Sequence, residues 1–330
     1  MHKPLSASLA MLAACAAVAA AGPAQAADAY PDHRVTLIVP FVPGGGTDSG
    51  ARVLATKLSE KWHQSVVVEN RGGAGGILGA DAVARAKPDG YTLLMGNVGT
   101  QSINPYLYGK LPYDPAKAFV PISMVADLPL ILVTSPKFKA TDLKQIIALG
   151  KAEPNAYSYA SSGIGNSTHL AMEVFESASG ARFRHIPYKG GGQANADVMS
   201  GEVPMQFTSI FGAVGMITSG KFRPIAVAGP ERSLALPDVP TMKEAGLENA
   251  DFASWIGVLA PAGTPAPIVE KIAADIREVM STKEVKDLLE AQGAVPHTST
   301  PKAFADHIAA DNRRLSALIR KLGIHADSAQ

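Results

Sequence analysis

Cysteine is nearly absent from this 330-residue sequence, in which Cys15 is the only one. A single cysteine excludes an internal disulfide framework and a cysteine-based metal site. Aromatic residues make up only 6% of the chain, and 30 basic residues balance 29 acidic ones. Without an excess of basic residues or a set of aromatic rings on which bases could stack, we expect no nucleic-acid partner.

Several common catalytic motifs are also missing. The sequence contains no G-x-G-x-x-G, H-E-x-x-H, C-x-x-C or G-x-S-x-G. These absences exclude the usual signatures of dinucleotide binding, zinc catalysis and serine hydrolysis. We therefore predict a protein that is not an enzyme and that uses neither a cofactor nor a metal ion.

The first 26 residues have the pattern of a secretory signal peptide. His2 and Lys3 give a basic start, residues 5–21 form an uncharged apolar run, and an A-x-A motif ends at Ala26. We expect cleavage after Ala26 and a periplasmic mature protein, in preference to lipoprotein processing at Cys15. No later segment has 18 consecutive apolar residues, so the sequence predicts no transmembrane helix in the mature chain.

Short strand-like segments alternate with helical patterns along the rest of the chain. They are rich in Val, Ile and Leu and bounded by Gly, Pro or Asp, which is typical of buried strands. This alternation predicts an α/β fold in which helices cover mostly parallel sheets. The predicted strands are residues 34–39, 66–69, 92–95, 120–125, 130–134, 184–186, 205–208, 225–228 and 256–259.

The chain has the length of two ordinary domains but contains no long flexible linker and no repeat. Two domains joined by a single connection would usually show a recognisable linker between them. We therefore predict two lobes connected by two crossings, with hinges near residues 126–130 and 250–255. Residues 27–127 together with 253–330 would form lobe 1, and residues 128–252 would form lobe 2.

Two glycine-rich loops each follow a strand-like segment and precede a predicted helix. One contains residues 41–48 and the other residues 161–168, and neither contains Lys or Arg. A helix N-terminus has unpaired N–H groups with partial positive charge, and glycines let an anion approach them closely. The two loops therefore predict a small anion held from both sides. A third loop, residues 188–192, is either another such cradle or a turn with a solvated lysine.

A catalytic alternative uses His169, Asp197 and either Ser161 or Ser162 as the triad of a periplasmic hydrolase that acts on an acidic substrate. His169, however, falls in the first turn of a predicted helix, where the helix dipole disfavours an imidazolium ion. We therefore favour binding over catalysis. Binding without turnover of the ligand would distinguish the two.

The segment from Phe41 to Arg52 resembles the P-F-x-x-G-G-x-T-D-x-x-A-R motif of the Bug family, the substrate-binding proteins of tripartite tricarboxylate transporters. The similarity continues in order through residues 66–76, 88–94, 112–115, 161–170, 187–190 and 236–241, which together span nearly the whole mature chain. Gly72 stands where the family usually has Pro, a difference that concerns the stiffness of the loop.

The resemblance implies a two-lobed periplasmic binding protein of type II, or Venus-flytrap, architecture. Such a protein closes over a small carboxylate in the cleft between its lobes and does not catalyse a reaction. The implied partners are the membrane subunits of a transporter, with the receptor itself a monomer. The implied ligand-binding residues are Gly44, Gly45, Gly46 and Thr47 on one side and Ser162, Asn166 and His169 on the other, with Asp197, Thr208 and Ser209 as further wall residues.

Two questions stay open at the level of the sequence. Dicarboxylates, citrate-like acids, acidic amino acids and aromatic acids would all suit a pair of anion cradles. The protein could also serve a sensor kinase in place of a transporter.

Overall fold

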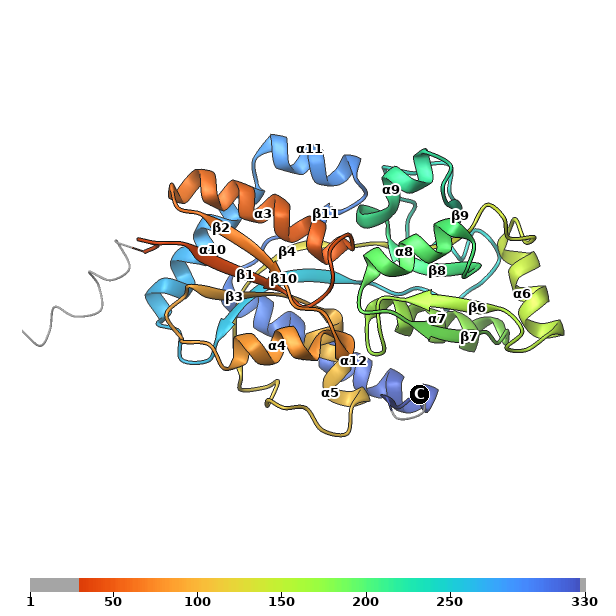
Figure 1. Ribbon diagram of the computed structural model, residues 1–330, viewed down its shortest axis with the longest axis horizontal. Coiled ribbons are helices and arrows are strands. Elements are labelled where there is room, and N and C mark those ends of the chain that lie inside the picture. Colours follow the sequence, from red (N-terminus) through yellow and green to blue (C-terminus); the bar gives the residue numbers. More distant parts are fainter. Residues whose placement is uncertain (1–29, 327–330) are drawn as a thin grey trace, which may run out of the picture.

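The computed structural model describes residues 30–326, and within them the chain forms two lobes that lie side by side (Figure 1). Each lobe is built on its own sheet, with helices packed on the faces. The expected signal peptide, its cleavage site after Ala26, and Cys15 all lie outside the described residues. None of the helices between residues 30 and 326 is long and apolar enough to span a membrane.

Lobe 1 contains a six-stranded sheet with the order β11–β4–β10–β3–β1–β2. Its strands are β1 (Val35–Val39), β2 (Val66–Asn70), β3 (Thr92–Asn97), β4 (Phe119–Asp127), β10 (Trp255–Pro261) and β11 (Val295–Pro296). Its helices are α3 (Gly46–Trp62), α4 (Ile77–Ala84), α5 (Asn104–Leu107), α10 (Ala266–Met280), α11 (Lys283–Ala291) and α12 (Pro301–Leu322). A 3₁₀ turn, η1 (Ala74–Gly76), and a π-helical segment, η2 (Gly99–Ile103), complete the lobe.

The alternation of side chains along β1 explains why this sheet has helices on both faces. Val35 and Leu37 belong to one core cluster, together with Leu54 of α3 and Ile272 of α10. Ile38 belongs to a second cluster, to which α4 and α12 contribute. Successive strand residues point to opposite faces, so an apolar strand without alternation needs helices on both sides.

Lobe 2 contains a five-stranded sheet with the order β7–β6–β8–β5–β9. Its strands are β5 (Leu130–Thr134), β6 (Ser158–Ser161), β7 (Arg184–Pro187), β8 (Met205–Ser209) and β9 (Arg223–Val227). Its helices are α6 (Leu143–Ala152), α7 (Ser167–Ser179), α8 (Gly191–Ser200) and α9 (Ile210–Thr218). Residues of α8 and α9 pack on one face of the sheet, and residues of α6 and α7 on the other.

The chain passes from one sheet to the other twice, first between β4 and β5 and later between β9 and β10. The Leu128 N–H donates a hydrogen bond of 2.8 Å to the Ser254 carbonyl oxygen, so the two crossings are held side by side. This double connection replaces the single flexible linker that the sequence lacks.

The α/β fold expected from the sequence is confirmed, but the expectation of mostly parallel sheets is wrong. Strand β10 is antiparallel to both β3 and β4, and β5 is antiparallel to both β8 and β9. The reason lies in the crossings, because β4 leaves lobe 1 and β10 returns to it from the opposite direction. Strand β11 has only two residues, too few for any periodic pattern, and the sequence does not predict it.

Lobe 2 buries an ionisable carboxyl group, that of Glu176 on α7, which is 6% exposed. Its Oε1 atom accepts a hydrogen bond of 2.8 Å from the Phe183 N–H, and an Arg182 nitrogen lies 3.6 Å from its Oε2. Burial and the neighbouring Glu173 carboxylate raise the pKa of Glu176 to about 7, although Phe183 and Arg182 oppose the shift. The folded protein therefore keeps a proton on Glu176 at pH values where the unfolded chain has released it.

We predict that Glu176→Gln stabilises the protein at about pH 8 and has little effect at about pH 4. A raised carboxyl pKa gives a contribution to stability that is complete below the unfolded value of 4.5 and is lost as the pH rises to about 7. The Gln side chain is neutral throughout and still accepts from Phe183, so the gain at alkaline pH should approach about 3 kcal/mol.

Urea unfolding of both proteins at the two pH values measures this difference. The matched control is Glu248→Gln, a change at an exposed glutamate of the same lobe that should shift neither value. Equal stabilities of wild type and Glu176→Gln at alkaline pH would show that the buried carboxylate does not destabilise the fold.

Candidate ligand-binding site

A cavity lies between the two lobes, and the space in and before it that no protein atom occupies is about 470 Å³, open solvent included. Both sheets contribute to its walls, and so do the chain crossings. Among the described residues, no lysine or arginine lines it, and Asp48 is the only charged residue that does. The lining residues are Phe41, Val42, Gly45, Gly46, Thr47, Asp48, Asn97, Leu128, Leu130, Ser162, Asn166, Ser167, Thr168, Gly191, Thr208, Ser209 and Ser254.

Four helices begin at this cavity. Helix α3 of lobe 1 and helices α7, α8 and α9 of lobe 2 each place the N-cap or the first residue in its wall. The N-caps of α3 and α8 are Gly45 and Gly190, and neither has a side chain that bonds to the first N–H groups. Those N–H groups therefore remain available to an anion, and the four helix dipoles add positive potential in the same place.

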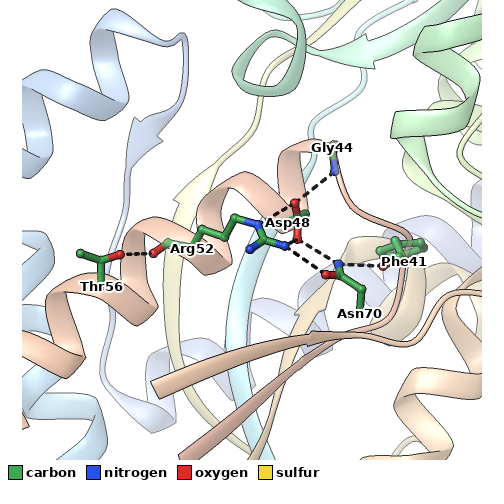
Figure 2. Close-up of polar contacts among 6 residues, drawn as sticks. All are labelled: Phe41, Gly44, Asp48, Arg52, Thr56 and Asn70. Atoms are coloured by element: carbon green, nitrogen blue, oxygen red, sulfur yellow. Dashed lines mark hydrogen bonds and ion pairs between the residues drawn. The ribbon is translucent and has the colours of Figure 1, made fainter. Parts of the chain in front are cut away.

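Asp48 holds the glycine loop of lobe 1 in shape (Figure 2). Its Oδ2 accepts from the Gly44 N–H at 3.1 Å and from Arg52 Nε at 3.0 Å. Its Oδ1 accepts from Arg52 Nη2 at 3.0 Å and from Asn70 Nδ2 at 2.9 Å, and Asn70 also donates to the Phe41 carbonyl oxygen. The carboxylate thus ties both ends of the loop to helix α3 and strand β2.

These contacts also keep Asp48 ionised. Burial acts to raise the pKa of the Asp48 carboxyl group, but the hydrogen bonds from Arg52, Asn70 and Gly44 outweigh it and leave the pKa below its ordinary value. Because Arg52 pairs with this carboxylate at 3.0 Å, the charge that borders the cavity is compensated by a neighbour outside it. A negatively charged ligand therefore does not meet an unpaired negative charge there.

The glycine loop of lobe 2 is held by hydrogen bonds between its own residues. Asn166 Oδ1 accepts from Ser167 Oγ at 2.9 Å and from the Thr168 N–H at 3.4 Å. Thr168 Oγ1 accepts from the Ser162 N–H at 2.9 Å. These bonds set the start of α7 and leave the Asn166 amide nitrogen and the Ser162 hydroxyl without a protein partner among the described residues.

The structure brings most of the predicted site residues together around this cavity. Gly44 lies beside the wall, where it bonds to Asp48, and two predicted residues, His169 and Asp197, do not line the cavity. His169 is buried behind the loop, and Asp197 accepts a hydrogen bond from the Tyr188 hydroxyl. The predicted residues that line the cavity are Gly45, Gly46, Thr47, Ser162, Asn166, Thr208 and Ser209.

Several lining residues are not among the predicted site residues. Asp48, Ser167 and Thr168 belong to the two predicted glycine-rich loops, whereas Asn97, Gly191 and Ser254 lie outside them. Asn97 is the last residue of β3, which pairs in parallel with β1. Since β1 leads into the first glycine loop, the end of its parallel neighbour β3 lies at the same edge of the sheet, and this sequence signal was available. Gly191 belongs to the third glycine loop, residues 188–192. Because Gly191 lines the cavity, this loop faces the same cavity as the other two. Ser254 lies in a chain crossing and carries no sequence signal that would have marked it.

The triad considered from the sequence does not form. His169 Nδ1 accepts from the Gly165 N–H at 3.4 Å, and the His169 ring stacks on His185 at 4.3 Å between centroids. Ser161 instead contacts Nε2 of His185 at 2.6 Å and is fully buried. Burial, with a smaller contribution from His169, lowers the pKa of His185 to about 3, which makes it a poor base at neutral pH. The Ser161 and His185 pair therefore does not activate a nucleophile.

Within residues 30–326, no group of three or more His, Cys, Asp or Glu side chains could hold a metal ion.

Beside the cavity the two lobes meet through glycine backbone. The Val42 N–H of lobe 1 donates to the Lys189 carbonyl oxygen of lobe 2 at 3.3 Å. A Cβ atom on Gly191 would lie 3.2 Å from the Gly45 Cα, and one on Gly192 would lie 2.0 Å from the Pro43 carbonyl oxygen. Side chains at these positions would hold the lobes apart, so glycine permits the closed arrangement.

Comparison with known proteins agrees with this geometry. Residues 50–324 match the family described as "Tripartite tricarboxylate transporter family receptor". Protein BugT of Bordetella pertussis is 39% identical over 298 residues, which cover 90% of this chain and 91% of BugT.

Solved structures show the same fold. The structure entitled "R. palustris Rpa4515 with adipate" is 32% identical and superimposes with a TM-score of 0.87, over 90% of this chain and 99% of the other. MatC (Rpa3494) from Rhodopseudomonas palustris with bound malate is 30% identical with a TM-score of 0.83, over 88% of this chain and 100% of MatC. This chain therefore belongs to the family of tripartite tricarboxylate transporter receptors, which includes the Bug proteins, and it is a periplasmic-type solute-binding receptor and not an enzyme.

Proposed function

We propose that this protein captures a small carboxylate with two or more acidic groups and presents it to a tripartite tricarboxylate-type secondary transporter. The observation that carries the proposal is the convergence of four helix N-termini on a cavity that no lysine or arginine of residues 30–326 lines. Such a cavity stabilises negative charge through backbone dipoles and hydroxyl groups.

The ligands named for two relatives support the same class of ligand. Rpa4515 was solved with adipate and MatC with bound malate, and both ligands are dicarboxylates. Both proteins align with about nine tenths of this chain. A dicarboxylate could place one acidic group at the start of α3 and the other at the starts of α7 and α8.

The remaining parts of the proposal concern export, oligomeric state, transport partners and lobe closure. We propose export with cleavage after Ala26, action as a monomer, and delivery of the ligand to the membrane subunits of the transporter. The lobes would divide as residues 27–127 with 253–330, and residues 128–252. In this scheme the lobes close over the ligand by bringing the glycine backbone of residues 43–45 and 190–192 into contact.

We predict that a small organic acid stabilises the protein and is recovered unchanged. A ligand that binds only the folded state at a hundredfold excess over its dissociation constant adds about 2.7 kcal/mol, which corresponds to several degrees in melting temperature. A thermal-shift screen of succinate, malate, glutarate, adipate, citrate and benzoate would identify the acid. The amide or methyl ester of the same acid should give little shift, and consumption of the acid on incubation would contradict the receptor function.

We predict that Thr47→Ala weakens binding of the acid found in that screen by roughly tenfold or more, because a hydrogen bond to a charged group is lost. The Thr47 hydroxyl lines the cavity and has no protein partner among the described residues. Thr56→Ala is the matched control, because Thr56 lies on the same helix, is exposed, and bonds only to the Arg52 carbonyl oxygen (Figure 2). Calorimetric titration gives both affinities, and equal values for the two variants would remove Thr47 from the site.

We predict that Gly192→Ala prevents full closure and lowers the affinity by at least about tenfold, since only closed molecules hold the ligand from both sides. The new Cβ would lie 2.0 Å from the backbone oxygen of Pro43, which cannot move without separating the lobes. Gly215→Ala in α9 is the control, because a Cβ there meets nothing within 4 Å.

Both glycines lie in helices, where alanine is favoured, so neither variant should lose stability without ligand. Solution scattering with and without the acid should show compaction for wild type and Gly215→Ala but not for Gly192→Ala. Normal compaction and normal affinity of Gly192→Ala would mean that the lobes do not close through this contact.

A further inference from the structure

The polar groups of the cavity can be sorted into hydrogen-bond donors and acceptors, because the protein already uses some of them. Asn97 is the clearest case. Its Oδ1 accepts from the Thr100 N–H at 3.0 Å, which identifies that atom as the oxygen of the amide. The Asn97 backbone is held in place as well, because its N–H donates to Thr100 Oγ1 and its carbonyl oxygen accepts from the same hydroxyl. The side chain is therefore fixed with its NH₂ group as the part left for a ligand.

Three other residues that border the cavity, Asn166, Asp48 and Ser209, also use side-chain oxygens as acceptors. Asn166 Oδ1 accepts from Ser167 and Thr168. Both oxygens of Asp48 accept two hydrogen bonds each. Ser209 Oγ accepts from the Gly212 N–H at 3.2 Å.

Three backbone carbonyl oxygens of lining residues also accept hydrogen bonds. The Phe41 oxygen accepts from Asn70, and the Ser254 oxygen accepts from the Leu128 N–H at 2.8 Å. The Leu130 oxygen accepts from the Ala228 N–H at 2.8 Å. Each of these three oxygens already has one donor, so an ammonium group would have to share it with that donor.

The groups that remain are mainly donors. They are the amide nitrogens of Asn97 and Asn166 and the N–H groups at the starts of α3 and α8. Hydroxyl groups can accept as well as donate, but a ligand carboxylate requires them as donors. The unpaired hydroxyls in the described wall are those of Thr47, Ser162, Thr208 and Ser254.

We infer that this cavity selects acids without an ammonium group over amino acids of the same carbon skeleton, and that the fixed amide nitrogen of Asn97 is one of the groups that enforces the selection. The inference rests on the proposed function and narrows its ligand class. An ammonium group needs up to three acceptors, and it would enter a region where four helix N-termini already disfavour positive charge. Exclusion would follow from burying that charge among groups that are mainly donors.

The test compares three pairs of ligands that differ only by an amino group: succinate with aspartate, glutarate with glutamate, and adipate with 2-aminoadipate. Calorimetric titration of the full mature protein gives each dissociation constant. For every acid that binds, the amino counterpart should bind roughly 100-fold more weakly, as expected for a buried charged group left without its hydrogen bonds.

A second measurement uses Asn97→Asp, which preserves the shape of the side chain and can still accept from Thr100, but replaces the donor with an acidic oxygen. The variant should bind the plain acid less tightly, and its preference for that acid over the amino counterpart should fall at least about tenfold. Asn155→Asp makes the same chemical change at an exposed position of lobe 2 and should leave the preference unchanged.

The outcomes separate the two levels of the inference. An amino acid that binds within tenfold of its plain counterpart would overturn the selectivity while leaving the carboxylate receptor function in place. An unchanged preference in Asn97→Asp would remove Asn97 from the selection. Failure of all six compounds to bind would overturn the proposed capture of dicarboxylates, and this inference with it.

Discussion

The buried carboxylate of Asp48 is the contact on which the geometry of the site depends. Its two oxygens accept four hydrogen bonds, from Gly44, Asn70 and Arg52, and so join the glycine loop, strand β2 and helix α3. A loop that contains three consecutive glycines has many conformations available in isolation. The carboxylate restricts them to the one in which the N–H groups at the start of α3 face the cavity.

The charged groups that hold the loop in shape, Asp48 and Arg52, are therefore different from the groups proposed to bind the ligand. Arg52 lies outside the cavity and compensates Asp48, so the part of the chain that the structure describes places neither an unpaired anionic side chain nor a cationic one in the wall. Binding of an acid then depends on backbone dipoles and hydroxyl groups that are already oriented when the ligand arrives. Such groups carry partial charges only, and they lose less hydration on closure than a lysine or arginine would.

Glycine has a second role where the lobes meet. Residues 43–45 of one lobe and 190–192 of the other approach so closely that a single methyl group on Gly192 would reach the opposite backbone. The same residues that expose helix N–H groups to a ligand therefore also permit contact between the lobes. This double requirement explains why glycine-rich loops occur in both halves of the chain.

The sequence alone determined the α/β class and the family, and it identified the two glycine loops that meet at the cavity. These features depend on local patterns, namely apolar strands, glycines before helices and a motif near Phe41, which can be recognised without knowledge of distant contacts. Only the tertiary structure decided that Asn97, Gly191 and Ser254 join the cavity and that His169 and Asp197 do not line it. It also decided the antiparallel course of β10 and the pairing of Ser161 with His185 in place of His169. Each of these features depends on which segments, distant in the sequence, pack against each other in the folded chain. Local sequence patterns carry no information about such long-range contacts.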